Sequence, residues 1–320
     1  MAGYRETDLA GLSEVAMKEG MSPLVIITVF NYNGEINTAE CLDSVLRLNY
    51  PNYRIVIIDN GSTDASYGNL KKRYPELEFL EIKVNCGFVG AVNKALEYFA
   101  LSGGDYIFLL SNDTTVNPGM LSELVLRGEN DAKAGIIGPK VYYYHDPKRI
   151  YSAGGYVNFR TGIKGLIGAK QMDKGQFEIP RYVDYIAGCG MLVKREVYDR
   201  IGKFDSEYFM YSEESDYCQR AKSAGFQNLY VPDARMLHKV CGTNIYLSKN
   251  YIYYFIRNQL LFMKKHARWY MWPSFLIFFF AYHCLGYAVL LAQHRLFAVI
   301  PCIFRGVRDF FSGKYGDAHL

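Results

Sequence analysis

The 320-residue sequence predicts an α/β fold in which a mostly parallel central sheet is flanked by helices. Three apolar segments support this prediction, at residues 24–30, 54–58 and 106–110. Each is rich in β-branched or aromatic residues without polar alternation, as expected of strands that are covered on both faces. Each also leads into small polar residues, and ligands of open α/β sheets bind at the carboxyl ends of the strands.

The first two segments lead directly into turn-forming polar residues. Residues 24–30 are followed by Asn31 and Asn33, and residues 54–58 by Asp59 and the run Asn-Gly-Ser-Thr-Asp. Asn-Gly favours a tight turn, and the Ser, Thr or Asp after it can cap the next helix. We therefore expect these polar side chains to line one crevice.

The third segment, residues 106–110, ends in Ser111, Asn112 and Asp113, before a turn at residues 117–119. A carboxylate at a strand end can hold a divalent cation against a diphosphate. The alternative is that Asp113 only caps the following turn. Three such strand ends together favour a nucleotide site.

Several motifs resemble family 2 glycosyltransferases. The donor-binding half of that family resembles residues 25–34, 57–64 and 85–93, and its aspartate-x-aspartate signature resembles residues 110–113. Its acceptor half resembles residues 188–193, 204–205, 209–220, 232–238 and 257–258. The motifs occur in order over roughly residues 22–265, closest to rhamnosyltransferase-like enzymes that build surface polysaccharides.

This resemblance implies a GT-A fold, a Rossmann-like sheet flanked by helices, with a C-terminal apolar helical appendage. We expect an N-terminal extension at 1–22, a catalytic domain at 23–265 and a membrane-associating tail at 266–320. Within the catalytic domain, residues 23–120 form the nucleotide-binding half and residues 121–265 the acceptor half.

Composition excludes other classes of protein. Half of the residues are hydrophobic, which argues against disorder. Seven cysteines without a Cys-x-x-Cys pair indicate neither a zinc site nor a disulfide framework, and residues 1–22 lack the apolar core of a signal peptide. The sequence shows no dinucleotide-binding glycine motif, no Walker loop and no basic-aromatic nucleic-acid motif.

The C-terminal part is apolar and basic. From Arg257 onward, eight Lys and Arg residues oppose Asp309 and Asp317, which leaves a net charge of +6. The apolar stretch at 269–292 is about long enough to cross a bilayer, and basic residues flank it on both sides. A single crossing would place the second basic flank on the far side, against the positive-inside tendency. We therefore favour an in-plane helix or hairpin on an anionic membrane surface, with a true span or a buried helix as alternatives.

Candidate metal ligands and a candidate base follow from the resemblance. Asp113 and His238 are expected to bind Mn²⁺ or Mg²⁺, although Ser111 replaces the first acid of the signature. Glu214 aligns with the family's catalytic base, where an aspartate is usual, and Glu213 and Asp216 are the other catalytic candidates. The alternative is that these acids only complement the dipole of a helix that begins near Ser212.

The remaining candidates bind substrates. Asp59 is expected to accept from the N3–H of a pyrimidine base, and Arg257 to reach the diphosphate or to form a structural ion pair. The full nucleotide-binding set is Asn31, Asn33, Asp59, Asn85, Gly87, Gly90, Asn93, Asn112 and Arg257. The acceptor-binding set is Gly188, Gly190, Tyr208, Phe209 and Tyr211.

The sequence therefore predicts an inverting, metal-dependent glycosyltransferase at the cytoplasmic face of a membrane. It would move a sugar, rhamnose among the candidates, from a UDP- or dTDP-sugar to a lipid-linked saccharide, without a nucleic-acid partner. Two alternatives remain open: transfer to a polyprenyl phosphate, and a catalytically silent module that binds sugar nucleotides or glycans. The donor sugar, the acceptor linkage and the oligomeric state cannot be read from the sequence.

Overall fold

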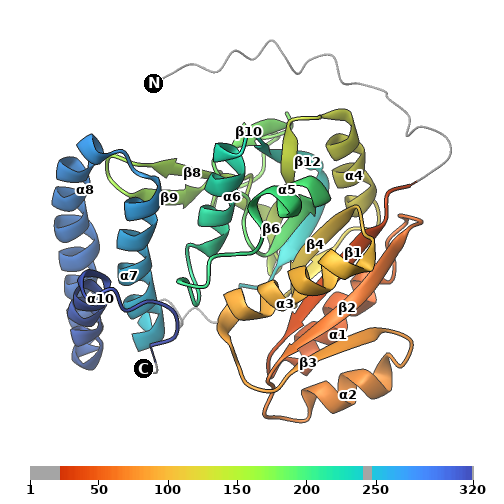
Figure 1. Ribbon diagram of the computed structural model, residues 1–320, viewed down its shortest axis with the longest axis horizontal. Helices are drawn as coiled ribbons and strands as arrows, with labels where there is room; N and C mark the ends of the chain where they lie inside the picture. The colour runs from red at the N-terminus through yellow and green to blue at the C-terminus, as the bar shows by residue number, and fades with distance from the viewer. Residues whose placement is uncertain (1–21, 241–246, 319–320) are drawn as a thin grey trace.

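The fold is built around one mixed sheet, seen in the computed structural model of this chain (Figure 1). The structure describes residues 22–240 and 247–318, so the expected N-terminal extension lies outside it except for Ser22. The strand order is β10-β12-β6-β11-β4-β1-β2-β3, with β5 paired to β12 and β7 paired to β6.

The nucleotide half of the sheet is parallel. It comprises β1 (Val25–Asn31), β2 (Tyr53–Asn60), β3 (Glu78–Ile82) and β4 (Tyr106–Ser111), joined through α1 (Glu35–Val45), α2 (Ser66–Arg73) and α3 (Gly87–Ser102). The three segments predicted from the sequence are β1, β2 and β4, and they lie side by side in the sheet. Their carboxyl ends therefore meet at one edge.

The other half mixes strand directions. It contains β5 (Thr114–Val116), α4 (Met120–Asn130), β6 (Ala134–Tyr143), β7 (Asp146–Ser152), β10 (Arg181–Val183), β11 (Gly190–Lys194), α5 (Arg195–Ile201), α6 (Glu213–Ser223) and β12 (Gln227–His238). Strand β11 runs antiparallel to both β4 and β6, whereas β12 runs parallel to β6. A separate hairpin pairs β8 (Gly155–Asn158) with β9 (Ile163–Leu166).

Each face of the sheet has its own apolar core, because successive strand residues point to opposite sides. Ile26 and Ile107 pack with the face that α3, α5 and α6 cover, whereas Ile27 and Phe108 pack with the face that α1 and α4 cover. The α/β fold predicted from the sequence is confirmed, and its parallel character is concentrated in the nucleotide half.

The C-terminal part is helical and lies to one side of the sheet (Figure 1). It contains α7 (Lys249–His266), η3 (Trp269–Met271), α8 (Trp272–Phe278), the π-helical turn η4 (Phe279–Leu285), α9 (Gly286–Gln293), η5 (Phe297–Val299) and α10 (Pro301–Phe311). Among the described residues, Trp269–Gln293 is the one helical stretch long and apolar enough to cross a membrane. Only 22% of its most apolar window is buried, which differs from a typical core helix.

Helix α10 packs against α7. A Cβ added to Gly306 would lie 2.9 Å from the carbonyl oxygen of Tyr253, so the two helix backbones approach closely at this glycine. The Tyr253 hydroxyl also donates a hydrogen bond to Asp309 (3.0 Å). The apolar appendage predicted from the sequence is present, and α7 connects it to the part of the chain that contains the sheet.

Candidate active site

Asp59 and Asn31 form the centre of the nucleotide end. They are register partners on adjacent parallel strands, and both are buried. The Asn31 amide donates to the Asp59 carboxylate (2.7 Å), which also accepts from the Ser62 hydroxyl (2.7 Å) and the Ser62 backbone N–H (3.0 Å). The carboxylate is therefore held in a fixed orientation at the strand end.

A chain of side-chain hydrogen bonds connects this centre to β4. Asn112 donates to the Thr38 hydroxyl (2.8 Å), which in turn donates to the Asn31 side-chain oxygen (2.8 Å). Thr38 lies on α1 and is fully buried. Its role was not predicted from the sequence, because a single threonine within a helix carries no local signal of function.

Two further asparagines shape the loops beside Asp59. The side-chain oxygen of Asn33 accepts from the backbone N–H groups of Thr63 (2.8 Å) and Asp64 (3.3 Å). Asn85 accepts from the backbone N–H of Gly87 (2.9 Å) and from the Asn60 amide (3.2 Å). Both candidates therefore hold backbone turns around the crevice.

The glycines of the 85–90 turn allow close packing. Gly87 has φ +73°, and a Cβ there would lie 2.6 Å from the Phe209 ring. A Cβ on Gly90 would lie 2.4 Å from the Cys86 sulfur. The backbone N–H of Val89 donates to the Phe209 carbonyl (3.3 Å), so the segment around Phe209 rests on the start of α3.

Asp113 and His238 lie together. Strand β5 pairs with β12 so that Thr114 opposes His238, and this brings Asp113 to the end of β12. The His238 Nε2 atom lies 3.2 Å from the Asp113 Oδ2 atom, and both side chains are mostly buried. Burial lowers the pKa of His238, but contacts with Cys189 and Asp113 outweigh it and raise the pKa to about 10.

This pair has the chemistry of a divalent-cation site. A carboxylate oxygen and a neutral imidazole nitrogen are both ligands of Mn²⁺, so a bound cation would take the place of the proton on His238 Nε2. Mg²⁺ is usually held by one or two carboxylates with phosphate and water. The other ring nitrogen of His238 is buried without a hydrogen-bond partner. Within the described residues, no group of three or more His, Cys, Asp or Glu gathers to hold a metal, so Asp113 and His238 are the two ligands that this part of the chain would supply.

The turn at residues 188–190 connects this pair to the acids of α6. The Ser111 backbone N–H donates to the Cys189 carbonyl (3.1 Å), and Gly190 opposes Leu110 in the sheet. On the other side of the turn, a Cβ on Gly188 would lie 3.5 Å from the Glu214 Cβ atom. The turn therefore lies between Asp113 and Glu214.

The three acids of α6 have different surroundings. Glu213 is buried, and one of its carboxylate oxygens has no hydrogen-bond partner. Burial and the charge of Glu214 raise the pKa of Glu213 well above its ordinary value, which favours the protonated form of this side chain. Glu214 is half-buried, with a contact of 3.4 Å from the Ser215 hydroxyl.

Asp216 lies in an ion-paired cluster. It accepts from Arg220 Nε (2.8 Å) and lies 2.7 Å from His266 Nε2. Burial raises the pKa of Asp216, but these two partners outweigh it and hold the pKa below its ordinary value. The side chain therefore joins α6 to the end of α7.

Two nucleotide candidates contact protein groups. Asn93 exchanges two hydrogen bonds with the backbone of Phe204 (2.9 and 3.0 Å). Arg257 is buried and donates to the Gly316 carbonyl (2.7 Å) and to the Glu207 carbonyl (3.4 Å). These contacts describe a structural role, and nucleotide contact stays a prediction for both.

The acceptor candidates form an aromatic segment between α3 and α7. The Phe209 ring stacks on Tyr254, with ring centroids 5.2 Å apart, and Tyr211 meets Tyr251 edge-on at 5.0 Å. Tyr208 is fully buried, and its hydroxyl has no hydrogen-bond partner. A Cβ on Gly190 would lie 2.6 Å from the Met236 sulfur, so this glycine serves close packing of β11.

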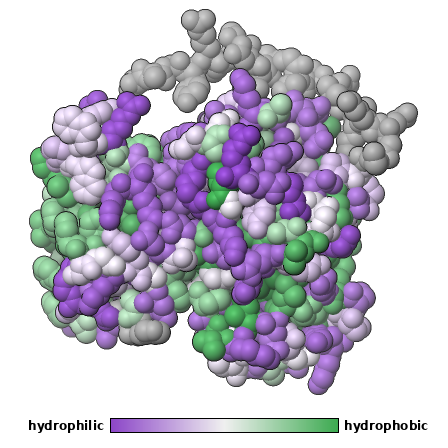
Figure 2. Space-filling model, in the orientation of Figure 1, coloured by the Kyte–Doolittle hydropathy of each residue, from purple (hydrophilic) through white to green (hydrophobic). Residues whose placement is uncertain are grey.

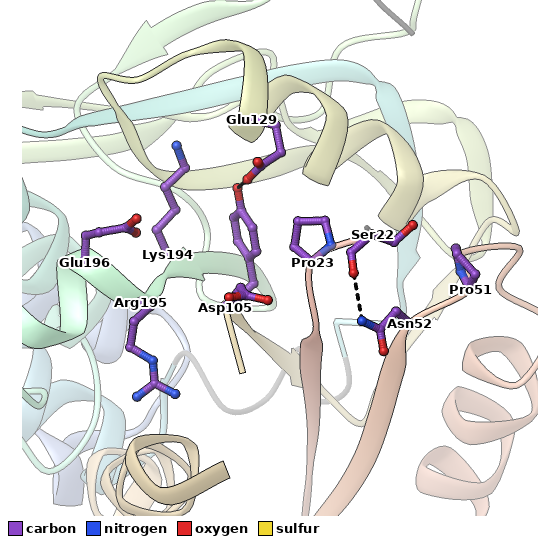
Figure 3. Close-up of a pocket in the computed structure, with 10 residues that line it drawn as sticks. Ser22, Pro23, Pro51, Asn52, Asp105, Glu129, Lys194, Arg195 and Glu196 are labelled. Atoms are coloured by element: carbon purple, nitrogen blue, oxygen red, sulfur yellow. Dashed lines mark hydrogen bonds between the residues drawn. The ribbon is translucent and has the colours of Figure 1, made fainter. Parts of the chain in front are cut away.

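A large groove of about 910 Å³ lies elsewhere (Figure 3). Its lining includes Pro23 and Asp105, which precede β1 and β4, and Lys194, which ends the antiparallel strand β11. It is therefore at the amino ends of the parallel strands, opposite to the edge where Asp59 and Asp113 lie. This groove is separate from the candidate active site.

The sheet carries polar side chains at adjacent strand ends, with a carboxylate–imidazole pair and several acids beside them. This arrangement is typical of α/β enzymes that bind a nucleotide and transfer a group from it. The Glycosyl transferase family 2 profile matches residues 24–202, more than half of the chain. The chain belongs to this family.

Curated relatives agree with this family assignment, and a solved structure shares the fold. The N-acetylglucosaminyl-diphospho-decaprenol L-rhamnosyltransferase of Mycobacterium tuberculosis is 27% identical over 205 residues, which cover 58% of this chain and 66% of the relative, just under two thirds. The dTDP-rhamnosyl transferase RfbF of Shigella flexneri is 24% identical over 77% of this chain and 82% of its own length. The mannosyltransferase PcManGT of Pyrobaculum calidifontis, solved with GDP-Man and Mn²⁺, has the same fold, with a TM-score of 0.57 and 16% identity. The match covers 92% of this chain and 88% of that protein.

Proposed function

We propose that this chain is an inverting, metal-dependent glycosyltransferase that moves a sugar from a UDP- or dTDP-sugar to a lipid-linked saccharide. Rhamnose is the first candidate sugar, because two of the similar proteins are named for rhamnosyl transfer. The observation that carries the proposal is the arrangement of Asp113, His238 and Glu214 around the 188–190 turn.

The nucleotide end would bind the base. Asp59 is fixed by Asn31 and Ser62 and has a carboxylate available to accept from a pyrimidine N3–H. Both uracil and thymine carry that N–H. Asn33 and Asn85 would keep the flanking turns in shape while the nucleotide binds.

Asp113 and His238 would hold Mn²⁺ or Mg²⁺. A bound cation would neutralise the negative charge that develops on the leaving diphosphate. Phosphate oxygens and water would complete the ligand set, since the chain supplies two ligands within the described residues.

Glu214 would act as the base that takes the acceptor proton. Glu213 is buried and its pKa is raised, and Asp216 is engaged with Arg220 and His266, so Glu214 is the acid of α6 best able to reach a substrate. General-base catalysis of this kind contributes roughly 10²–10⁴-fold.

The C-terminal helices would contact a membrane surface at the cytoplasmic face. Hydrophobic residues gather over α8 at the left edge of Figure 2. Large exposed apolar side chains on these helices and their connections include Trp269, Ile277, Phe280, Tyr282, Leu285, Phe297, Phe304 and Phe311. Arg308 is also exposed, which suits an anionic lipid surface. An in-plane position would bring a lipid-linked acceptor to the site.

The test is donor turnover by the purified chain with a panel of UDP- and dTDP-sugars, Mn²⁺ or Mg²⁺, and a membrane extract as acceptor source. We expect release of nucleoside diphosphate from one donor, lost with chelator and in Asp113→Ala. A matched control is Asp43→Ala, which removes a partly exposed carboxylate paired with Arg73 near the C-terminal end of α1, away from the candidate site. Retention of activity in Asp113→Ala would contradict the metal assignment.

The two alternatives are distinguished by the same assay. A phosphate acceptor has no hydroxyl proton to lose at neutral pH, so transfer to a polyprenyl phosphate would tolerate Glu214→Gln. Nucleotide binding without turnover of any donor, with membrane extract present, would support a silent binding module.

A further inference from the structure

Lys164 lies beside the acids of α6. It belongs to β9, in the hairpin that extends from the region of the sheet toward α8 (Figure 1). Its ammonium group donates a hydrogen bond to the hydroxyl of Ser212, the residue directly before Glu213 and Glu214. The same ammonium lies 4.5 Å from the centre of the Phe262 ring. A charged group from another part of the chain thus reaches the start of the catalytic helix.

The hairpin that carries Lys164 is firmly anchored. Phe159 stacks on Phe262 of α7, with ring planes 8° apart, and the Gly162 carbonyl accepts from the Gln259 side chain. A Cβ on Gly162 would lie 2.6 Å from the Phe275 ring of α8. Because both flanking helices hold the hairpin, the ammonium has a defined position.

Lys164 lies near three acids of α6, Glu213, Glu214 and Asp216. Burial lowers the pKa of Lys164 to about 8, against the opposing effect of the charges of Glu214, Glu213 and Asp216. Asp216 already has Arg220 and His266 as partners. Glu213 and Glu214 are therefore the two acids of α6 for which Lys164 is the nearby positive charge.

Other titratable groups face this cluster. His283, on the π-helical turn of the apolar helix, is buried, and burial together with the charge of Lys164 lowers its pKa, so its imidazole is neutral at pH 7. Burial, together with the charge of Glu214, raises the pKa of Tyr185 far above neutral pH, so its hydroxyl stays uncharged. Neither group supplies a positive charge to the acid pair.

We propose that Lys164 is a positioning residue of the acceptor site, whose ammonium stabilises the negative charge on Glu214 beside the buried Glu213. This inference rests on the proposed role of Glu214 as base. Two adjacent carboxyl groups do not both ionise readily in a buried site, and a nearby cation favours the ionised form. Without Lys164, Glu214 would stay protonated up to a higher pH. The base would therefore be inactive at the lower end of the pH range in which it normally works.

The first test needs no enzyme activity. In protein labelled with ¹³C-lysine, NMR titration follows each ammonium group, and the Lys164 signal is assigned by its loss in Lys164→Arg. We expect a midpoint near 8, which falls by about one further pH unit in Glu214→Gln because a neighbouring negative charge is lost. A Lys164 midpoint grouped with the exposed lysines near 10.5, unchanged by Glu214→Gln, would overturn the proposal.

The second test is the pH dependence of acceptor-dependent transfer. In Lys164→Met we expect the acidic limb of the kcat profile to move up by about one pH unit, so that the rate falls about tenfold on that limb and recovers at higher pH. Lys164→Arg keeps the charge and should restore the limb, and Lys174→Met removes an exposed lysine as a control. A loss of rate that is equal at every pH, or an unmoved limb, would contradict the inference.

The two proposals fail in different ways. If the unaltered chain releases no nucleoside diphosphate from any donor, the proposed function fails, whereas the lysine titration still decides whether Lys164 and Glu214 interact. If transfer is normal but Lys164→Met leaves the titration of the pair unchanged, only the positioning role fails.

Discussion

Replacement of Asp216 by Asn should destabilise the fold far more than it alters chemistry. The Asp216 side chain is 1% exposed and is held by Arg220 and His266, both through charge-assisted contacts. An amide of the same shape carries no charge, keeps one acceptor oxygen and turns an N–H₂ group toward Arg220 or His266. Breaking a buried pair of this kind costs about 3–5 kcal/mol of unfolding free energy. For a chain of 320 residues, with an unfolding entropy of about 2.1 cal/mol/K per residue, that is roughly a 4–8 °C fall in Tm.

The assay is urea unfolding at several pH values, with nucleoside diphosphate release measured on the folded protein. Because the pKa of Asp216 is held below its ordinary value of 3.8, its stabilising effect is fully present above about pH 4 and is lost as pH falls through the folded pKa. The difference between Asp216→Asn and the unaltered chain should therefore shrink below pH 4. Asp43→Asn, which weakens an exposed pair with Arg73, should change stability by less than about 1 kcal/mol.

The result that would refute this reasoning is the reverse pattern. If Asp216→Asn kept its unfolding free energy to within about 1 kcal/mol while turnover fell a hundredfold or more, Asp216 would act on the substrate. The catalytic role of Asp216 considered from the sequence would then be correct.

Three further predictions concern the nucleotide end and the tail. Gly87→Ala should destabilise the chain and weaken nucleotide binding in calorimetry, because the added Cβ would clash with the Phe209 ring. The control is Gly103→Ala, at a similar φ of +71° but with open space around it, which should lose only what backbone strain costs, about 1–2 kcal/mol of unfolding free energy. Asn31→Ala should weaken UDP or dTDP binding about tenfold in the same assay, since it removes the donor that orients Asp59, and unchanged affinity would contradict this. Replacing three exposed aromatics together by Ser should reduce sedimentation with anionic vesicles at least tenfold, and undiminished sedimentation would argue against an in-plane tail; the three are Trp269, Phe297 and Phe304.

The strand ends were predictable because their signal is local. An apolar run that stops at Asp59 or Asp113 defines both the strand and the position of the acid. A parallel arrangement of β1, β2 and β4 then brings these ends to one edge of the sheet, as the topology confirms. The hydrogen bond from Asn31 to Asp59 follows from the register of neighbouring strands, which the sequence alone does not specify.

Other contacts depend on residues that are distant in sequence. Arg257 was expected to reach the diphosphate or to form an ion pair, and its contact with the Gly316 carbonyl requires the chain after α10 to return to α7. His266 meets Asp216 across 50 positions, and Lys164 meets Ser212 across 48. No local pattern around Lys164 marks it, because β9 is a short hairpin strand whose register sets the direction of each side chain.

The acids of α6 show how one local motif divides into separate roles. Glu213, Glu214 and Asp216 lie within the first turn of the helix, and from the sequence each was a candidate for the base. The fold gives Asp216 two partners, Arg220 and His266, buries Glu213 and raises its pKa, and leaves Glu214 half-buried against the 188–190 turn. The helix dipole favours negative charge at all three positions equally, so it cannot distinguish them. Tertiary contacts distinguish them. His266 of α7 contacts Asp216, and Lys164 of β9 contacts Ser212 at the start of α6. The surroundings of the three acids therefore depend on how α7 and β9 pack against the start of α6.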